Sequence, residues 1–183
     1  MEIGNKDIHY ELVEAAKSYD SAAQFELYKL YSKAMLNVSY RILRDLEESE
    51  DVLQEAFVTA FKKIGSFRGD STFGAWLKRI VVNGSLNVLK KRKLEFNSID
   101  ELDEPALETE EEVADLTVDQ IKQAMVCLPD GFRTVFSLYV FEGYDHREIS
   151  DILDISESTS KSQYNRAKKK LQLIIKEMYD YER

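Results

Sequence analysis

The hydrophobic residues in the first half of the chain recur every three or four positions, the spacing of one face of an α-helix. Three such stripes lie within residues 21–43, 49–64 and 73–88, and a glycine-containing loop at 65–70 separates the last two. The stripes consist of Phe25, Tyr28, Tyr31, Met35, Val38 and Ile42, of Leu53, Phe57, Ala60 and Ile64, and of Phe73, Trp76, Leu77, Ile80, Val81, Gly84 and Val88. The pattern predicts a small helical bundle.

Short polar residues precede the second and third stripes, where a helix would begin. A hydroxyl at such a place accepts hydrogen bonds from the first backbone N–H groups, which lack a partner inside the helix. Ser49 is therefore expected to cap the second helix, and Ser71 or Thr72 the third.

The second half of the chain begins with two further helical patterns. The first is broken at Pro129-Asp130-Gly131, and the second is expected to end at Gly143. Their inward faces consist of Ile121, Met125 and Leu128, and of Phe132, Val135, Phe136 and Tyr139.

Residues 144–171 have the spacing of a helix-turn-helix. Asp145 is expected to cap a short helix, a turn follows at 154–156, and Ser156 is expected to cap a longer helix. The inward residues of the two helices are Ile149, Ile152 and Leu153, and Ser160, Tyr164, Ala167 and Leu171. A helical hairpin in an ordinary bundle is the alternative interpretation.

Composition supports an all-α fold and limits the function. Seven Gly and two Pro in 183 residues leave few turns for a β fold. The single cysteine, Cys127, lies in an apolar run and is predicted to be a buried thiol rather than a nucleophile. Residues 1–10 lack a signal-peptide pattern and no apolar run is long enough to span a bilayer. We therefore expect a cytoplasmic protein without membrane insertion.

The net charge of −9 is unevenly distributed. Eleven acidic residues and no basic one lie in the segment from Glu95 to Asp119. Residues 71–94 and residues 158–175, in contrast, each contain basic residues and no acidic one. Two cationic segments of this kind are expected of a protein that contacts phosphates at two places. The predicted organisation is two small helical domains, residues 1–94 and 117–183, joined by an acidic flexible linker at 95–116.

Short motifs in both halves resemble those of one family. They are Asp51–Phe57, Ser66–Phe73, Trp76–Ile80 with Asn83, Leu128-Pro129, Glu142-Gly143-Tyr144, Glu148–Leu153, and Lys161-Ser162 with Arg166-Ala167. In this order and spacing, the chain resembles the sigma factors of bacterial RNA polymerase, specifically the extracytoplasmic-function (ECF) branch, which keeps conserved regions 2 and 4. The likeness covers about residues 20–94 and 116–175.

The resemblance implies that Asp51, Gln54 and Glu55 bind the core polymerase, formed around its β and β′ subunits. Taken without the family, these residues are a solvated helix face, with Asp51 stabilised by the helix dipole. The resemblance also implies an anti-sigma factor as a partner.

The resemblance further implies that the first domain recognises and melts the minus-ten element of promoter DNA. Separated bases need a pocket and a cationic surface that follows the strands. The implied residues are Phe67, Arg68, Gly69, Asp70, Ser71, Thr72, Lys78, Arg79, Asn83, Asn87, Lys90, Lys91, Arg92 and Lys93. Phe73 and Trp76 lie on the apolar stripe and are expected to be core residues.

In the second domain, the resemblance implies that the longer helix of the helix-turn-helix reads the minus-thirty-five element in the major groove. The residues expected to contact DNA are Ser158, Thr159, Lys161, Ser162, Gln163, Asn165, Arg166, Lys168 and Lys169. Asp154 replaces a frequent turn glycine, Ser160 an apolar residue, and Gln163 a frequent Arg. Because Gln favours adenine and Arg favours guanine, we expect an unusual upstream preference.

Other functions remain open at this point. The linker acts either as a nucleic-acid mimic in a basic polymerase channel, which the resemblance suggests, or only as a spacer. An autonomous helix-turn-helix regulator is the main alternative function, and a polymerase-binding adaptor without base readout is another. An enzyme is not expected, because His9 and His146 stand alone and the chain has no catalytic, metal-binding or cofactor-binding motif.

Overall fold

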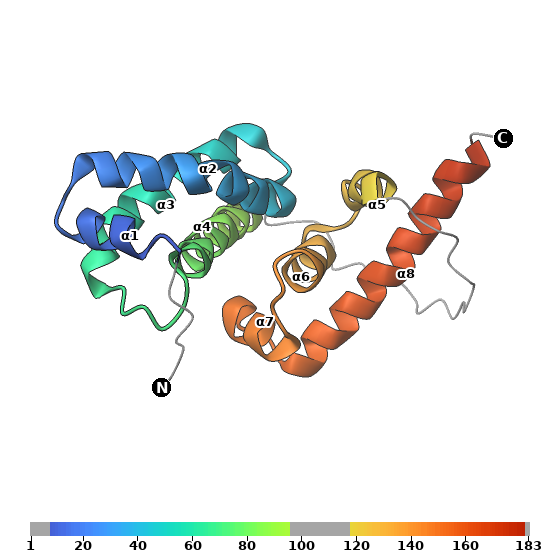
Figure 1. The fold of residues 1–183 in the computed structure, drawn as a ribbon. Coiled ribbons are helices and arrows are strands. Elements are labelled where there is room, and N and C mark those ends of the chain that lie inside the picture. Colours follow the sequence, from blue (N-terminus) through green and yellow to red (C-terminus); the bar gives the residue numbers. More distant parts are fainter. Residues whose placement is uncertain (1–7, 96–117, 182–183) are drawn as a thin grey trace. The chain divides into compact units, whose positions relative to one another are not determined.

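The computed structural model describes residues 8–95 and 118–181. Every regular element within these ranges is helical, as predicted (Figure 1). The chain divides into two compact units, with the boundary after Arg92, and each is described by itself. The predicted acidic linker at 95–116 lies outside the described residues except for Glu95.

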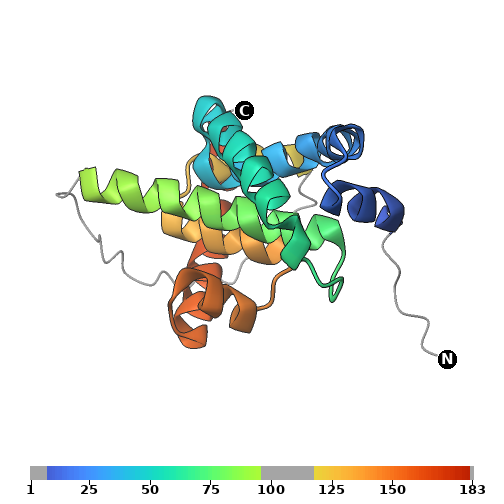
Figure 2. The same ribbon diagram turned by 90° about the vertical axis from the view of Figure 1, so that its left-hand side faces the viewer.

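The first unit is built from four α-helices and one turn of 3₁₀-helix. They are α1 (Tyr10–Lys17), α2 (Ser21–Leu43), α3 (Leu46–Lys63), η1 (Ile64–Ser66) and α4 (Phe73–Glu95). Figure 2 shows α4 from the side, with α3 lying across it. The short helix α1 was not predicted from the sequence.

An aromatic cluster forms part of the core of the first unit. Phe73, at the start of α4, is fully buried, and its ring centroid lies 5.4 Å from that of Tyr31 and 5.7 Å from that of Trp76. Phe67, from the loop before α4, packs on both Phe73 and Trp76. Burial of one such ring contributes about 2–3 kcal/mol, so the cluster anchors the loop to α4.

Helix α3 begins earlier than predicted, and Ser49 is not its cap. Asp45 is the N-cap, because its side chain accepts a hydrogen bond from the backbone N–H of Glu48 at 2.9 Å. Ser49 is buried inside the helix, where its hydroxyl donates to the Asp45 carbonyl. The predicted cap of α4 is confirmed at Thr72, whose hydroxyl accepts from the N–H of Ala75 at 3.2 Å.

The predicted stripe of α2 is wrong at its first two positions. Phe25 is 59% exposed and Tyr28 is 37% exposed, whereas Leu27 is fully buried. At this end of α2 the core-facing side carries Ala23 and Leu27, so Phe25, two positions from each, lies on the outer side of the helix. Farther along, Ser39 and Ser85 are both buried and share a 2.9 Å hydrogen bond between α2 and α4.

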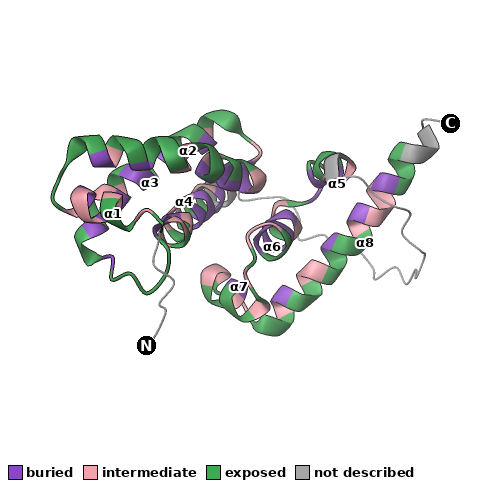
Figure 3. Cartoon of the chain, viewed as in Figure 1, coloured by how far each residue is buried: buried purple, intermediate pink, exposed green. Residues whose placement is uncertain are grey.

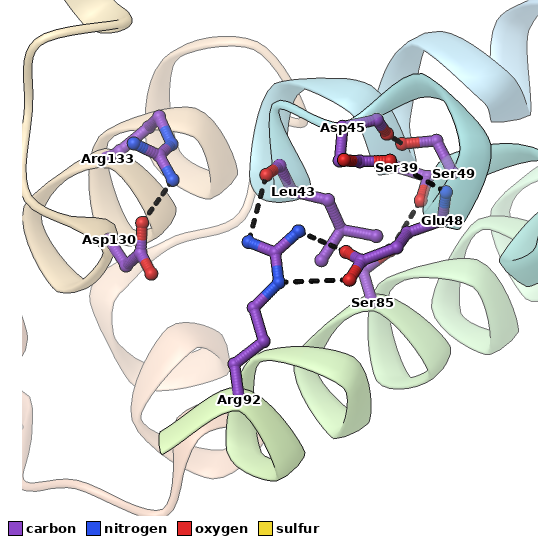
Figure 4. A network of polar contacts seen from close by, with 9 residues as sticks. All are labelled: Ser39, Leu43, Asp45, Glu48, Ser49, Ser85, Arg92, Asp130 and Arg133. Atoms are coloured by element: carbon purple, nitrogen blue, oxygen red, sulfur yellow. Dashed lines mark hydrogen bonds and ion pairs between the residues drawn. The ribbon is translucent and has the colours of Figure 1, made fainter. Parts of the chain in front are cut away.

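Arg92 was predicted to contact DNA, but its guanidinium is used inside the first unit (Figure 4). It forms an ion pair with Glu48, with the Nε to Oε1 distance at 3.2 Å, and donates to the carbonyl of Leu43 at 3.2 Å. These bonds join the last turns of α4 to the end of α2 and the start of α3. Arg92 is therefore a structural residue in this fold.

The second unit contains four helices: α5 (Val118–Met125), α6 (Asp130–Val140), α7 (His146–Leu153) and α8 (Glu157–Tyr181). One face of α8 supplies Ala167, Leu171 and Ile175 to the core. Figure 3 shows buried and exposed positions alternating along this helix. The other main core residues are Ala124, Met125, Leu128 and Phe136.

A buried arginine fixes the turn between α5 and α6. Arg133 is 4% exposed, donates to the carbonyl of Leu128 at 2.8 Å and forms an ion pair with Asp130. The charge is therefore paired and hydrogen-bonded, as a buried guanidinium requires. The predicted break between the two helices is confirmed, but it ends at Pro129, because Asp130 and Gly131 are the first residues of α6.

Three predictions for the second unit need correction. Cys127 is exposed: it lies in the turn that follows α5, between the buried Met125 and the buried Leu128. Tyr139 is 38% exposed. Helix α6 ends at Val140; Gly143, with φ of 77°, then reverses the chain, and the N–H of Tyr144 bonds back to the Leu138 carbonyl at 3.0 Å.

We predict that Arg92→Met lowers the free energy of unfolding of the first unit by about 1–2 kcal/mol, because Glu48 and the Leu43 carbonyl lose a charged donor. Partial exposure of the pair limits the loss. Urea unfolding of the full chain, followed by the fluorescence of Trp76, its one tryptophan, measures it. The control Lys91→Met changes an exposed neighbour and is expected to cost less than about 0.5 kcal/mol. Equal stability of the two variants would contradict the structural role of Arg92.

Candidate nucleic-acid interface

The three residues predicted to bind the polymerase lie on the outer face of α3. Asp51, Gln54 and Glu55 are all exposed. Their spacing of three and four residues places them on one side of the helix, while Val52 and Leu53 belong to the core. The packed helix therefore presents these polar side chains on a rigid support.

A groove of about 320 Å³ lies between α3 and α4. Its lining residues are Val52, Glu55, Ala56, Thr59, Lys63, Ile80, Asn83, Gly84 and Asn87. Glu55, predicted to bind polymerase, thus shares this groove with Asn83 and Asn87, predicted to bind DNA. Gly84 keeps the helices close, because a Cβ at this position would lie 3.1 Å from Cγ1 of Val52.

Sequence reasoning missed the groove. Thr59 and Lys63 contribute to its wall but lay outside the predicted motifs. The only signal along the chain was their spacing from Glu55 at four and eight residues, which places all three on one face of α3. That face becomes a groove wall only once α4 packs beside it.

The loop predicted to hold an unpaired base is anchored by its first residue. Phe67 is 8% exposed, so its side chain is part of the core and does not face outward. Its predicted contact with promoter DNA stays a prediction, and in the free protein the ring packs in the core. The remaining loop residues are exposed: Arg68, Gly69, Asp70, Ser71 and Thr72. Gly69 has φ of 81°, a conformation that favours glycine.

The predicted DNA-binding residues of α4 differ in how far their side chains are exposed. Arg79, Asn83, Asn87, Lys90 and Lys91 are exposed, and Lys78 is half-buried. Arg92 is held by Glu48, and the side chain of Lys93 lies outside the described residues. The exposed members follow the helix for about three turns and form a polar, cationic strip.

The helix-turn-helix of the second unit is confirmed in its details. Asp145 caps α7 and forms a reciprocal capping box with Glu148. Asp154 follows the last residue of α7 and adopts the left-handed conformation, with φ of 56°. Glycine is frequent at this position because it adopts that conformation easily, and Asp tolerates it. Ser156 caps α8 by accepting from the N–H of Thr159 at 3.0 Å.

The outer face of α8 carries the predicted DNA-contacting residues. Ser158, Lys161, Ser162, Asn165, Arg166, Lys168 and Lys169 are exposed, and Thr159 and Gln163 are half-buried. Lys161 pairs with Glu157 at 2.6 Å, and this hydrogen bond and charge lower the pKa of the Glu157 carboxyl. The helix thus offers hydroxyl, amide and cationic groups on one side.

A polar and aromatic cluster lies behind this face. The ring of His146 stacks on Tyr139 with centroids 4.6 Å apart, and Nδ1 of His146 lies 2.9 Å from the hydroxyl of Ser160. Tyr164 contacts both Tyr139 and His146. Burial, followed by the charge of Tyr139, raises the pKa of Tyr164 above its usual value. The sequence had indicated that His146 stands alone, but in the structure it contacts Ser160, Tyr139 and Tyr164.

No helix in the described ranges is long and apolar enough to cross a membrane. Within the same ranges, no group of three or more His, Cys, Asp or Glu side chains is placed to hold a metal ion.

Two helical units, the second containing a helix-turn-helix with a polar outer face, define the class: a two-domain helix-turn-helix protein. Family models agree with both halves. The model of Sigma-70 region 2 matches residues 27–95, and that of Sigma-70 region 4 matches residues 119–171.

Sequence comparison with known proteins finds relatives that are sigma factors of bacterial RNA polymerase. The chain is 29% identical to the RNA polymerase sigma-H factor of Pseudomonas aeruginosa, with 91% of this chain and 95% of the relative covered. It is 26% identical to the ECF RNA polymerase sigma factor SigW of Bacillus subtilis, covering 91% and 96%. With the ECF RNA polymerase sigma-E factor of Escherichia coli K12 it shares 30% identity, covering 64% and 69%. The chain belongs to the ECF sigma factors of bacterial RNA polymerase.

Solved structures show the same fold. CnrH, in complex with the cytosolic domain of CnrY, matches with a TM-score of 0.57 and 21% identity, covering 91% of this chain and 96% of CnrH. The sigma factor RpoE of Bartonella quintana, in complex with the anti-sigma factor NepR, matches with a TM-score of 0.58 and 23% identity, covering 82% and 95%. The findings support a sigma factor, a transcription regulator, and not the alternative of an autonomous regulator.

The raised pKa of Tyr164 predicts a loss of stability at alkaline pH. The folded state holds the phenolic proton more tightly than the unfolded chain, so this contribution is complete below about pH 10 and declines as pH rises through the folded pKa. Tyr164→Phe removes the titrating group. Urea unfolding at several pH values between 9 and 11 is expected to show a smaller decline for the variant than for the natural chain. Parallel declines would show that Tyr164 does not titrate differently in the two states.

Proposed function

We propose that this ECF sigma factor divides its work between its two domains. Residues 1–94 bind core RNA polymerase and recognise and melt the minus-ten element, and residues 117–183 recognise the minus-thirty-five element. Residues 95–116 connect them. The observation that carries the proposal is that each folded unit presents an exposed polar face, on α3 and α4 in one and on α8 in the other.

Core polymerase binds the outer face of α3 in this proposal. Asp51 and Glu55 supply negative charge and Gln54 supplies an amide, all on one side of a helix whose opposite side is packed. A basic helical surface on the polymerase complements this face. Because the side chains are exposed before binding, contact requires no rearrangement of the first unit.

Minus-ten DNA follows α4 and the exposed loop from Arg68 to Thr72. Arg79, Lys90 and Lys91 neutralise phosphates, and Asn83 and Asn87 offer amides that bond base edges. Phe67 contributes by holding the loop on the core, and Arg92 contributes by fixing the end of α4. The groove between α3 and α4 places the two asparagines beside the polymerase-binding face.

Minus-thirty-five DNA contacts the outer face of α8 in the major groove. Thr159, Gln163 and Arg166 are the base-reading candidates, since they lie on successive turns of the same side. Lys161, Lys168 and Lys169 are placed to contact phosphates.

An anti-sigma factor is the proposed regulatory partner. Both solved relatives with the same fold carry a bound protein: CnrH with the cytosolic domain of CnrY, and RpoE with NepR. We place the protein in the cytoplasm, where core polymerase and promoter DNA are found.

The polymerase-binding face is tested by charge reversal. The double variant Asp51→Lys/Glu55→Lys is expected to weaken binding of the full chain to core polymerase at least about tenfold, because two attractive contacts become repulsive. The control Glu26→Lys/Lys29→Glu inverts an exposed pair on α2 and leaves the net charge unchanged. A second control, Glu26→Lys alone, reverses one charge on α2 and so makes half of the net-charge change of the double variant. Fluorescence titration of labelled chains measures affinity. If Glu26→Lys weakened binding to core polymerase as much as the double variant does, the effect of the double variant would come from net charge and not from the outer face of α3.

The base-reading role of α8 is tested at Gln163. Gln163→Arg in the holoenzyme is expected to shift preference at one upstream position from adenine toward guanine, because Arg forms paired bonds with guanine. Lys168→Gln is expected instead to weaken binding to all upstream sequences. It is also expected to lower the number of counterions released on binding, measured from the salt dependence of the affinity, by about one. Selection from a promoter library measures both. An unchanged preference in Gln163→Arg would remove Gln163 from the base-reading set.

A further inference from the structure

The start of the recognition helix is joined to the start of the preceding helix by one side-chain hydrogen bond. His146 is the first residue of α7, and Ser160 lies one turn into α8. Their Nδ1 and Oγ atoms are 2.9 Å apart, although the residues are 14 positions apart in sequence. The bond therefore spans the helix-turn-helix.

Ser160 has no exposed surface. A hydroxyl buried on the inner face of a helix destabilises the fold unless it is hydrogen-bonded. At this position an apolar residue would fill the core without any such requirement. The imidazole of His146 supplies the missing bond, and the two residues thus form a matched polar pair inside the helix-turn-helix.

The imidazole itself is held by rings from two other helices. Tyr139 of α6 stacks on it, with an interplanar angle of 18°, and Tyr164 of α8 meets it edge-on, with centroids 5.6 Å apart. Tyr164 is one turn beyond Ser160, so His146 contacts α8 at two successive turns. Its ring is consequently unable to change direction without disturbing either α6 or α8.

We propose that His146 and Ser160 are positioning residues for DNA recognition: their directional bond sets the tilt and rotation of α8 relative to α7. This inference rests on the proposed role of α8 at the upstream element. Thr159 precedes Ser160 and Gln163 follows it by three residues, so both base-reading candidates move when the helix rotates at Ser160. Apolar packing alone is non-directional and permits such small rotations.

The test separates positioning from stability by comparing a single variant with a double variant. His146→Phe keeps a stacking ring and removes the hydrogen bond, which leaves the hydroxyl of Ser160 buried without its partner. His146→Phe/Ser160→Ala removes both polar groups, so stability is expected to recover toward that of the natural chain. The matched control is Ser39→Ala/Ser85→Ala, which removes a buried hydroxyl pair from the first unit.

Full-length chains are assembled with core polymerase, and each holoenzyme selects from a promoter library randomised at the upstream element. The natural chain is expected to enrich one upstream sequence. His146→Phe and the double variant are expected to lower its enrichment over scrambled sequences about fivefold, a size typical of coupled contacts. The salt dependence of binding to scrambled DNA is expected to stay unchanged, because phosphate contacts do not require the same register. The control pair is expected to leave the upstream preference intact.

The outcomes distinguish the inference from the proposed function. A double variant that regains both stability and full upstream preference would show that the pair serves stability alone and would overturn the inference. A natural holoenzyme that enriches no upstream sequence would overturn the proposed role of α8 together with the inference. A stable double variant with relaxed preference supports positioning, and it does so even where His146→Phe alone fails to fold.

Discussion

Each half of this sigma factor depends on burial of one face of one long helix. In the first unit that helix is α4, which carries the fully buried Phe73, Leu77 and Val81. In the second it is α8, whose inner face carries Ala167 and Leu171. Because a helix packed on one side keeps its other side outward, the same burial that stabilises each unit also orients its polar residues.

Two arginines show how the packed units use charged side chains internally. Arg92 lies in a run of bases, yet its guanidinium bonds to Glu48 and the Leu43 carbonyl. Arg133 likewise fixes a turn in the second unit. Position within the packed unit, and not charge along the chain, therefore shows which guanidinium groups already have acceptors inside the protein.

The candidate interfaces combine residues that are distant in sequence. Glu55 of α3 and Asn83 and Asn87 of α4 line one groove, which brings the proposed polymerase and promoter contacts together. In the second unit, His146 and Ser160 connect the two helices of the helix-turn-helix. Packing explains how short helical units keep such faces in place.

Helical periodicity and capping chemistry alone determined the all-α fold, the helix-turn-helix, and the caps at Asp145 and Ser156, and they limited the cap of α4 to Ser71 or Thr72, because these depend on residues within one or two turns. Motif order was sufficient for the family. Only tertiary structure decided that Phe25 is exposed, that Phe67 is core, and that Arg92 is bound internally. These outcomes depend on which neighbouring helix covers each position, and contacts between residues tens of positions apart leave no local pattern in the chain.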